Sequence, residues 1–470
     1  MKAPLLMITL LIIIFSSFLY ASPTSPTNSN SEPAQCYDYP NPLNRNYKVP
    51  VQCKVSKQKI QTSNLASKGS KKNMFDVTFT CGVKNTILCN KVKKTFETAG
   101  NIISSTFILN SPITINASFV DFCVVLGDCG GKTGLVTLGG ASPARTIPLQ
   151  DDDGLVRLYP QALVKQFQFN THPEYGPYDI SAMFNSAEKN FWFDGDGKIK
   201  QDQQDFLYVV LHELIHGLGF ASNWGDYIVE DTPTTITPDF SLLQEIGSKL
   251  IIFNGFMESA FDKYLIQIPS GRRTSEITDQ LNEFPGGTNV KFSSTEDFEA
   301  KFKASPQYKL GLNMMKTITT PSSLGFLPHN STDPEQAIIL ETSLNPYQQG
   351  SSISHVDFNT YNATSDFLMK YLADRGVNMH TITMSRGCTD AIGPKLKLIL
   401  ETMGYATSNN PNPYKPSVTI VSNNLNPNIK GSVASVLPKP NSSPKMINFD
   451  FETHIVLNLI GFITVRYLLK

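Results

Sequence analysis

The chain has 470 residues, enough to bury a large core, and 40% of them are hydrophobic, which is typical of a folded protein. Its 40 Lys and Arg residues balance 40 Asp and Glu residues, and no run rich in Lys or Arg stands out. This charge pattern argues against nucleic acid as a partner.

The N-terminus, MKAPLLMITLLIIIFSSFLYASPTSP, has the features of a secretory signal peptide. One lysine precedes a long apolar run, which gives way near Ala21 to a stretch of Ser, Pro and Thr. We therefore expect residues 1–21 to be removed and the protein to be secreted or held at the cell surface. An uncleaved signal anchor is the alternative, because the apolar run is long.

The seven cysteines all follow this segment, and an oxidising compartment predicts that they form disulfides. Pairs close in sequence, Cys81 with Cys89 and Cys123 with Cys129, are the expected bridges, although spacing alone does not determine connectivity. The odd thiol is free, pairs between chains, or leaves with a removed segment. Glycosylation sequons agree with passage through a secretory pathway, and they start at Asn116, Asn330, Asn362 and Asn441.

Residues 22–73 are rich in Pro, Asn, Ser and Lys and predict a loosely ordered segment or pro-region. A folded pattern begins at residue 74. A helical spacing occupies residues 90–107, and alternating or strand-like patterns occupy 74–81, 111–122, 134–149 and 178–187. This order predicts an α+β fold with a twisted mixed sheet packed on helices.

The pattern is less regular between residues 225 and 350. Helices are expected at 241–253 and 256–268, and loops at 285–292 and 329–336. A further helix is expected to end at Gly404.

Two low-complexity or apolar segments close the chain. Residues 406–445 are rich in Asn, Pro and Ser and predict a linker. Residues 446–470 are apolar but too short for a membrane span, and Arg466 interrupts them. Small residues at 441–443, a polar spacer and this tail fit a GPI-attachment signal, so membrane attachment through the tail is one expectation. A buried or frayed tail is the other.

The stretch LYVVLHELIHGLGFASNW, residues 207–224, contains the motif H-E-x-x-H. On a helix His212 and His216 lie on one face and can bind one metal ion, while Glu213 lies beside them, placed to accept a proton from a metal-bound water. Asp202 is expected to cap this helix, and the glycines of HGLG are expected to end it. A pair of core histidines beside a stray glutamate is the alternative, but it would leave polar groups without partners in an apolar helix.

A catalytic zinc ion requires three protein ligands and one open position. Ser222 stands three residues after Gly219, where many secreted zinc proteases have the third histidine, but its hydroxyl stays protonated and is a poor ligand. Glu230 and Glu245 are available beyond the helix. Among the histidines, His355 differs from the others because Leu368 and Met369 follow it closely; the others are His172, His329, His380 and His454.

HELIHGLGF, a long insertion and then SHVDF…DFLM resemble the leishmanolysin-type metzincin zinc proteases over residues 74–405. The resemblance implies a metzincin-like catalytic domain with an irregular C-terminal subdomain and an insertion at 225–350. It implies that Glu213 is the catalytic base, that Met369 forms a hydrophobic floor, and that one catalytic Zn2+ is bound by His212, His216 and His355.

Two further features have less specific signals. Tyr371 is similar to the tyrosine that astacin-like enzymes place near the metal, and a packing residue is the alternative. Residues 194–202, DGDGKIKQD, hint at Ca2+ but lack the third alternating oxygen ligand of an EF-hand loop, so a turn between strands is favoured.

The predicted function is a secreted or cell-surface zinc-dependent endopeptidase that acts on proteins or peptides. A zinc-activated water attacks the peptide bond, with Glu213 as general base. The alternative is a non-catalytic, glycosylated surface or adhesion protein on a metzincin-like scaffold. The tail and the Asn/Pro-rich linker favour that alternative, whereas the intact H-E-x-x-H argues against it.

Overall fold

The structure is a computed structural model that describes residues 34–56, 73–129, 135–228, 233–244, 250–287, 290–416 and 466–468. The predicted signal peptide, Asn441, His454 and most of the predicted linker and tail lie outside these ranges. Within them, no helix combines the length and the apolar character that crossing a membrane requires.

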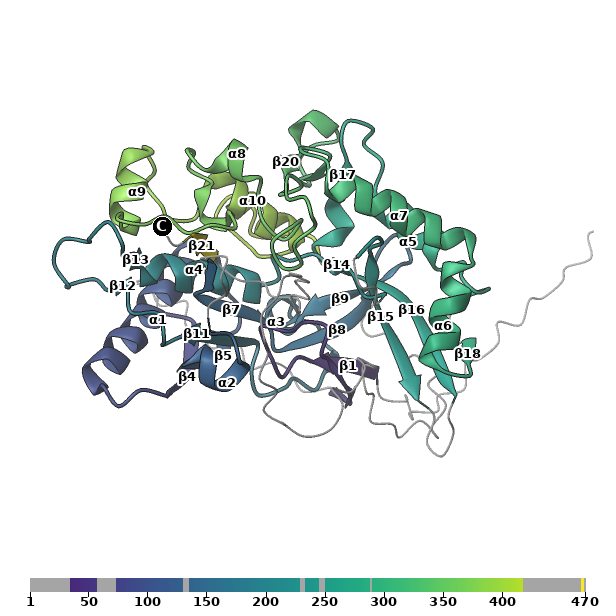
Figure 1. The fold of residues 1–470 in the computed structure, drawn as a ribbon, viewed down its shortest axis with the longest axis horizontal. Helices are drawn as coiled ribbons and strands as arrows, with labels where there is room; N and C mark the ends of the chain where they lie inside the picture. Colours follow the sequence, from purple (N-terminus) through teal and green to yellow (C-terminus); the bar gives the residue numbers. More distant parts are fainter. Residues whose placement is uncertain are drawn as a thin grey trace, which may run out of the picture.

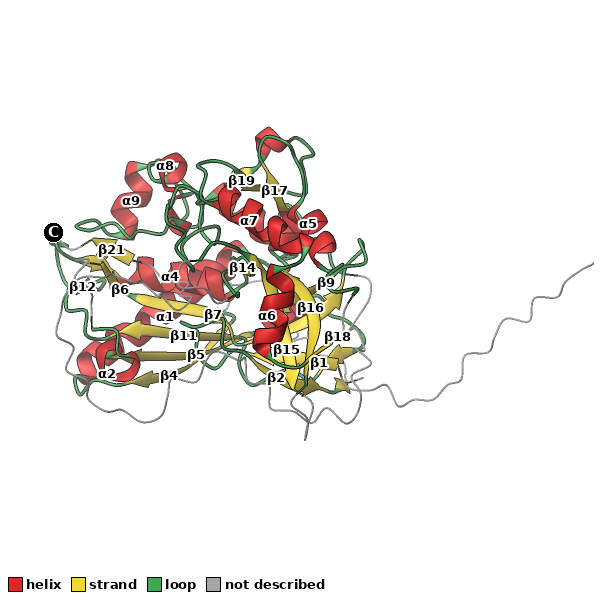
Figure 2. Cartoon of the chain, turned by 45° about the vertical axis from the view of Figure 1, so that its right-hand side comes forward, coloured by secondary structure: helices red, strands yellow, loops and turns green. Residues whose placement is uncertain are grey.

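The described chain has two main sheets. One of them is a four-stranded mixed sheet with the order β4-β5-β11-β7. Figure 2 shows these strands side by side. β4, β5 and β11 are parallel, and β7 runs antiparallel to β11 at the edge. The strands confirm the four predicted strand segments, and their bounds are β4 Phe75–Cys81, β5 Ile113–Val120, β7 Gly139–Pro143 and β11 Ile180–Asn185.

Two helices pack on this sheet and on each other, α1 (Thr86–Thr106) and α4 (Phe206–Gly217). α4 contacts both β7 and β11. Aromatic side chains fill the interface: the ring of Phe184 on β11 lies 5.3 Å from that of Phe96 on α1 and 5.5 Å from that of Phe206 on α4. This packing buries nearly all of α4, including the motif H-E-x-x-H.

The start of α4 differs from the prediction. Asp205, not Asp202, is the N-cap, and its carboxylate accepts a hydrogen bond from the Leu207 N–H at 2.9 Å. The reason is the pairing of β13 (Gln204–Asp205) with β12 (Phe191–Trp192), which keeps the chain extended up to the cap. Residues 194–202 form the connection between these two strands.

The second main sheet is larger. Its strands follow the order β14-β15-β16-β9-β8-β1-β2, and β18 pairs with β16. Its strands come from three distant parts of the chain. They are β1 Ala34–Asp38, β2 Val49–Cys53, β8 Arg145–Gln150, β9 Val156–Pro160, β14 Trp224–Gly225, β15 Thr237–Gln244, β16 Ile251–Ser259 and β18 Val290–Phe292. The insertion and the N-terminal segment therefore belong to one sheet.

The N-terminal segment is more ordered than its composition predicted. β1 and β2 form a hairpin that pairs with β8, and Cys36–Cys53 joins the two strands. Two residues of β1 pair with the start of β8, more than a hundred positions downstream, and no local pattern reveals such a partner.

The helices expected at 241–253 and 256–268 are wrong. These residues form β15, β16, η1 (Asp262–Tyr264) and β17 (Leu265–Gln267). The cause is burial: eight of the nine residues of β16 are buried, so its sequence does not alternate. A continuous apolar run does not distinguish a strand that is buried on both faces from a helix.

Helices of the insertion lie over β15 and β16, whereas α8 to α10 lie near α4 (Figure 1). The C-terminal part is irregular, as expected, and α10 ends at Gly404 as predicted. The remaining helices are α2 Phe122–Leu126, α3 Gln161–Gln166, α5 Thr274–Leu281, α6 Thr295–Lys303, α7 Pro306–Ile318, η2 Pro334–Gln336, α8 Phe358–Tyr361, η3 Phe367–Met369, α9 Met379–Ser385 and α10 Pro394–Met403.

Short strands complete the fold. β3 pairs with β10, β21 with β6, and β17, β19 and β20 form a small sheet. Their bounds are β3 Val55–Ser56, β6 Leu135–Thr137, β10 His172–Pro173, β19 Leu324–Phe326, β20 Ile338–Ile339 and β21 Arg466–Leu468.

Disulfides join Cys81 to Cys89 and Cys123 to Cys129, which confirms both expected pairings. The odd thiol is Cys388, which is free.

A buried ion cluster joins β9 to β16. The Arg157 side chain is fully buried, and its Nε lies 2.9 Å from Glu258 Oε2. Its Nη1 and Nη2 lie 3.0 and 2.7 Å from carboxylate oxygens of Asp151 and Asp153. A buried charge is tolerated only with partners of this kind.

We expect Arg157→Met to lower the free energy of unfolding by about 3–5 kcal/mol, because it leaves the buried Glu258 carboxylate without a counter-charge. Urea denaturation followed by circular dichroism measures the change. Arg272→Met is the matched control: Arg272 forms an exposed i,i+4 pair with Glu276, worth at most about 0.5 kcal/mol. Equal losses in the two variants would contradict a structural role for the cluster.

Candidate metal centre

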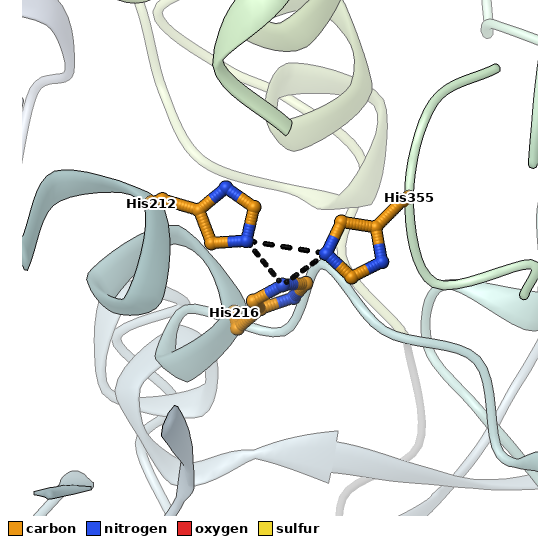
Figure 3. A group of neighbouring side chains, drawn as sticks. All are labelled: His212, His216 and His355. Carbon is orange, nitrogen blue, oxygen red and sulfur yellow. Dashed lines mark hydrogen bonds between the residues drawn. The ribbon is translucent and has the colours of Figure 1, made fainter. Parts of the chain in front are cut away.

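Three histidines from two distant segments meet in the interior. His212 and His216 lie on α4, and His355 lies 139 positions after His216 in a loop. Their Nε2 atoms are 3.0, 3.2 and 3.3 Å apart in pairs, as Figure 3 shows. All three side chains are fully buried. The structure thus brings together the three predicted ligands.

The other ring nitrogens show which atoms carry the protons. Nδ1 lies 2.7 Å from Leu368 O in His212, 2.7 Å from Phe220 O in His216 and 3.0 Å from Ser351 O in His355. A carbonyl oxygen only accepts, so each Nδ1 is the N–H donor. In the neutral ring Nε2 is then an acceptor, and three lone pairs point at one another.

The electrostatics of the three imidazoles favour a cation between them. Burial, and then the charge of the neighbouring imidazoles, lower the pKa of His212 and His216 well below the ordinary value, which disfavours protonation. A tetrahedral metal with Zn–N bonds of about 2.1 Å separates its ligand nitrogens by about 3.4 Å. The observed separations of 3.0–3.3 Å are close to this value, so the three histidines could hold a metal ion.

The loop that carries His355 is held by backbone hydrogen bonds. Glu341 N–H donates to His355 O at 2.8 Å, and Ile353 N–H donates back to Glu341 O at 2.8 Å. Ile353 adopts a φ of +55°, in the left-handed region that β-branched residues rarely enter. Strained backbone of this kind persists where surrounding contacts impose it, and it gathers at functional sites.

The turn at η3 supports His212. The Tyr208 hydroxyl on α4 donates to Leu368 O at 3.0 Å, the same carbonyl that accepts from His212 Nδ1. Met369 is fully buried, and its carbonyl accepts from Val356 N–H at 3.0 Å, next to His355. Tyr371 packs its ring 5.7 Å from that of Phe358. Its place at the metal stays a prediction.

Glu213 is fully buried beside the histidines on α4. Its Oε2 accepts a hydrogen bond from the backbone N–H of Ala141 at 2.9 Å. Ala141 lies on β7, the edge strand, so the sheet orients the carboxylate. Sequence reasoning missed this partner, because a backbone N–H leaves no signal in the residue type.

Ser222 is engaged elsewhere in the structure. Its hydroxyl donates to Asp262 Oδ1 at 2.6 Å, and its N–H lies 3.2 Å from the Ser354 hydroxyl, next to His355. Asp262 Oδ2 also accepts from Asn223 N–H and Ser259 N–H, both at 2.8 Å. The fully buried Asp262 therefore fixes the loop that follows α4. Sequence reasoning missed it because it lies in a segment predicted to be helical.

Of the other candidate ligands, those that the structure describes do not join the cluster. Glu230 and Glu245 lie outside the described residues. His172 stacks on Tyr175, and His329 Nδ1 lies 2.9 Å from the Thr402 hydroxyl.

We expect Asp262→Ala to lower the free energy of unfolding by about 2–4 kcal/mol, because each buried donor left without an acceptor costs about 1–3 kcal/mol. Asp262→Asn keeps one acceptor oxygen and should lose less than half as much. Urea unfolding of the two variants measures the difference. Equal losses would mean that the hydrogen bonds to Asp262 are not what holds the loop.

Comparison with known proteins identifies relatives of most of the chain. A protein from Schizosaccharomyces pombe named "Uncharacterized protein PB7E8.01" is 30% identical over 368 residues, which are 73% of this chain and 64% of that protein. The chain thus spans less than two thirds of this relative's length. No solved structure matches. Residues 36–434, which include all three histidines, match the SPBPB7E8-like family, and the chain belongs to that family.

Proposed function

We propose that this protein is a secreted or cell-surface zinc-dependent endopeptidase. The observation that carries the proposal is the convergence of three imidazole lone pairs beside a buried glutamate on the same helix. Imidazole nitrogens suit zinc, and three protein ligands with one open position are typical of catalytic zinc. The disulfides agree with an oxidising, extracellular location.

His212, His216 and His355 would hold the ion through Nε2. When bound, zinc would supply Lewis-acid chemistry, acidifying a water molecule and polarising a peptide carbonyl. The three carbonyl acceptors at Nδ1 keep each ring in the tautomer and orientation that ligation needs.

Glu213 is the proton carrier in this proposal. Its carboxylate accepts the proton of the attacking water and then donates it to the amine that leaves. The Ala141 N–H holds Oε2 in place, so the carboxylate needs little reorganisation.

A metzincin-like fold is part of the proposal. It is supported by the antiparallel edge strand β7 beside α4, by a third histidine far beyond the helix, and by a buried methionine in the turn below His212. Residues 225–350 would then be an insertion that enlarges the second sheet.

Loss of a residue that only supports a metal ligand weakens metal binding by about 10- to 100-fold. We expect His355→Ala to weaken zinc binding by more than this, because it removes a ligand itself. Equilibrium dialysis with elemental analysis measures bound zinc. His380→Ala, which alters an exposed histidine on α9, is the control and should bind zinc as the wild type does. Zinc retained at wild-type affinity after His355→Ala would point to another third ligand, such as Glu230 or Glu245.

We expect Glu213→Gln to retain zinc and to lower kcat for casein or peptide hydrolysis by about 10²- to 10⁴-fold, since it removes the general base while keeping an acceptor for Ala141 N–H. Glu276→Gln, at an exposed position on α5, is the matched control. Unchanged hydrolysis by the zinc-loaded Glu213→Gln protein would contradict the assigned role.

The second candidate is a non-catalytic surface protein on the same scaffold. Complete burial of Glu213 and the three histidines favours it, because a catalytic centre must admit a substrate. The wild-type protein distinguishes the two: zinc binding without digestion of any protein substrate supports the second candidate.

A further inference from the structure

A loop from the N-terminal hairpin contacts the segment that follows the metal-centre residue His216. Arg45 lies in the β1–β2 loop, and its Nη1 and Nη2 donate to Ser222 O at 3.2 Å and to Asn223 Oδ1 at 2.6 Å. The next residue, Asn46, accepts a hydrogen bond from Gln349 at 2.9 Å. The loop therefore spans the segment that follows His216 and the segment that precedes His355.

Arg45 brings a positive charge without a matching negative one. It is partly buried and forms no ion pair with any carboxylate of the described residues, whereas Arg145 and Arg157 both do. A guanidinium has five N–H donors, and those of Arg45 that face Ser222 and Asn223 meet only neutral oxygens. Its planar fork matches a carboxylate better than any other group.

Two buried donors in the loop that Arg45 contacts also lack an acceptor among the described residues. Asn223 is 2% exposed, and its Nδ2 has no hydrogen-bond partner. Because Oδ1 of the same amide accepts from Arg45, Nδ2 lies next to the guanidinium. The indole Nε1 of Trp224, 3% exposed, has no partner either. Buried donors are rarely left unpaired, so these two groups are available to an acceptor that binds in this loop.

Asp226, a described acid of this loop, does not meet this need. Asp226 lies in the same loop, and its Oδ1 also lacks a partner, yet it forms no ion pair with Arg45 in the described structure. Burial raises the pKa of Asp226 to about 6, so this carboxylate is protonated more readily than an exposed one.

We propose that Arg45 and Asn223 form a carboxylate-binding subsite of the metal centre, which selects peptides with an acidic side chain or a chain terminus close to the cleaved bond. The inference rests on the proposed peptidase function. Two observations on the described residues carry it: a guanidinium without an ion pair and a buried amide donor without an acceptor meet in the loop that begins where Phe220 O accepts from His216. A carboxylate there would accept from both groups at once.

Matched peptides test the subsite. Zinc-loaded full-length protein is given peptides that differ only by Asp or Asn at one position on either side of the cleaved bond, each with a free or an amidated C-terminus. We expect kcat/KM to be about 10- to 100-fold higher with the carboxylate, the range of a hydrogen bond to a charged group. The Asp/Asn arm and the free/amidated arm identify which carboxylate is read.

For each Arg45 variant, kcat/KM for the carboxylate peptide is divided by kcat/KM for the neutral peptide. A loss of activity that affects both peptides equally cancels in this ratio. Arg45→Gln should bring the ratio of kcat/KM for the carboxylate and neutral peptides to about one, and Arg45→Glu should bring it below one. Arg272→Gln, at an exposed arginine, is the control and should keep the wild-type ratio. A wild-type ratio near one, or a ratio that survives Arg45→Gln, overturns the subsite while the peptidase function stands.

A binding measurement separates failure of the subsite from failure of the peptidase proposal. Trp224 is one of two tryptophans in the chain and lies in the subsite loop, so its fluorescence reports ligand binding to the zinc-loaded Glu213→Gln protein. Tighter binding of the carboxylate peptide, lost in the Arg45→Gln/Glu213→Gln double variant, supports the subsite even if the wild type cleaves nothing. Equal binding of both peptides overturns it.

Discussion

The arrangement of the interior depends on three buried imidazoles that turn their lone pairs toward one point. Each ring gives its only N–H to a backbone carbonyl, and none of these carbonyls can supply a proton in return. Without a cation, three acceptors at 3.0–3.3 Å repel one another in a medium where electrostatic forces are weakly screened. In the proposed metal centre, the backbone carbonyls that accept from Nδ1 would therefore favour metal binding as much as the histidines themselves.

The fold holds these carbonyls through contacts that are far apart in sequence. The carbonyl that orients His212 comes from the turn at Leu368, and Tyr208 of the same helix also binds it. The loop after α4 is fastened by Asp262, which belongs to the insertion, and by Arg45, which belongs to the N-terminal hairpin. The insertion and the hairpin, which belong to one sheet, thus both hold the loop that follows the two histidines of α4.

The sequence predicted the parts of this site that depend on local spacing. Two histidines at i and i+4 in an apolar helix lie on one face whatever the tertiary structure does, and the distant His355 was singled out by its neighbours Leu368 and Met369. It did not predict β16, because a strand buried on both faces has no alternation. Nor did it predict Asp262, whose role is to accept backbone and hydroxyl donors brought there by strand pairing.

The replacement of a nearby third ligand by a distant one has a consequence for folding. With Ser222 hydrogen-bonded to Asp262, the loop after α4 is held by the insertion and not by a metal ion. The metal would instead join α4 to a loop 139 positions away, across the whole insertion. Because a ligand that binds only the folded state adds its binding free energy to stability, zinc would stabilise the contact between these two segments more than either segment alone. Closing a longer loop costs only a little more entropy, and metal binding would offset that cost.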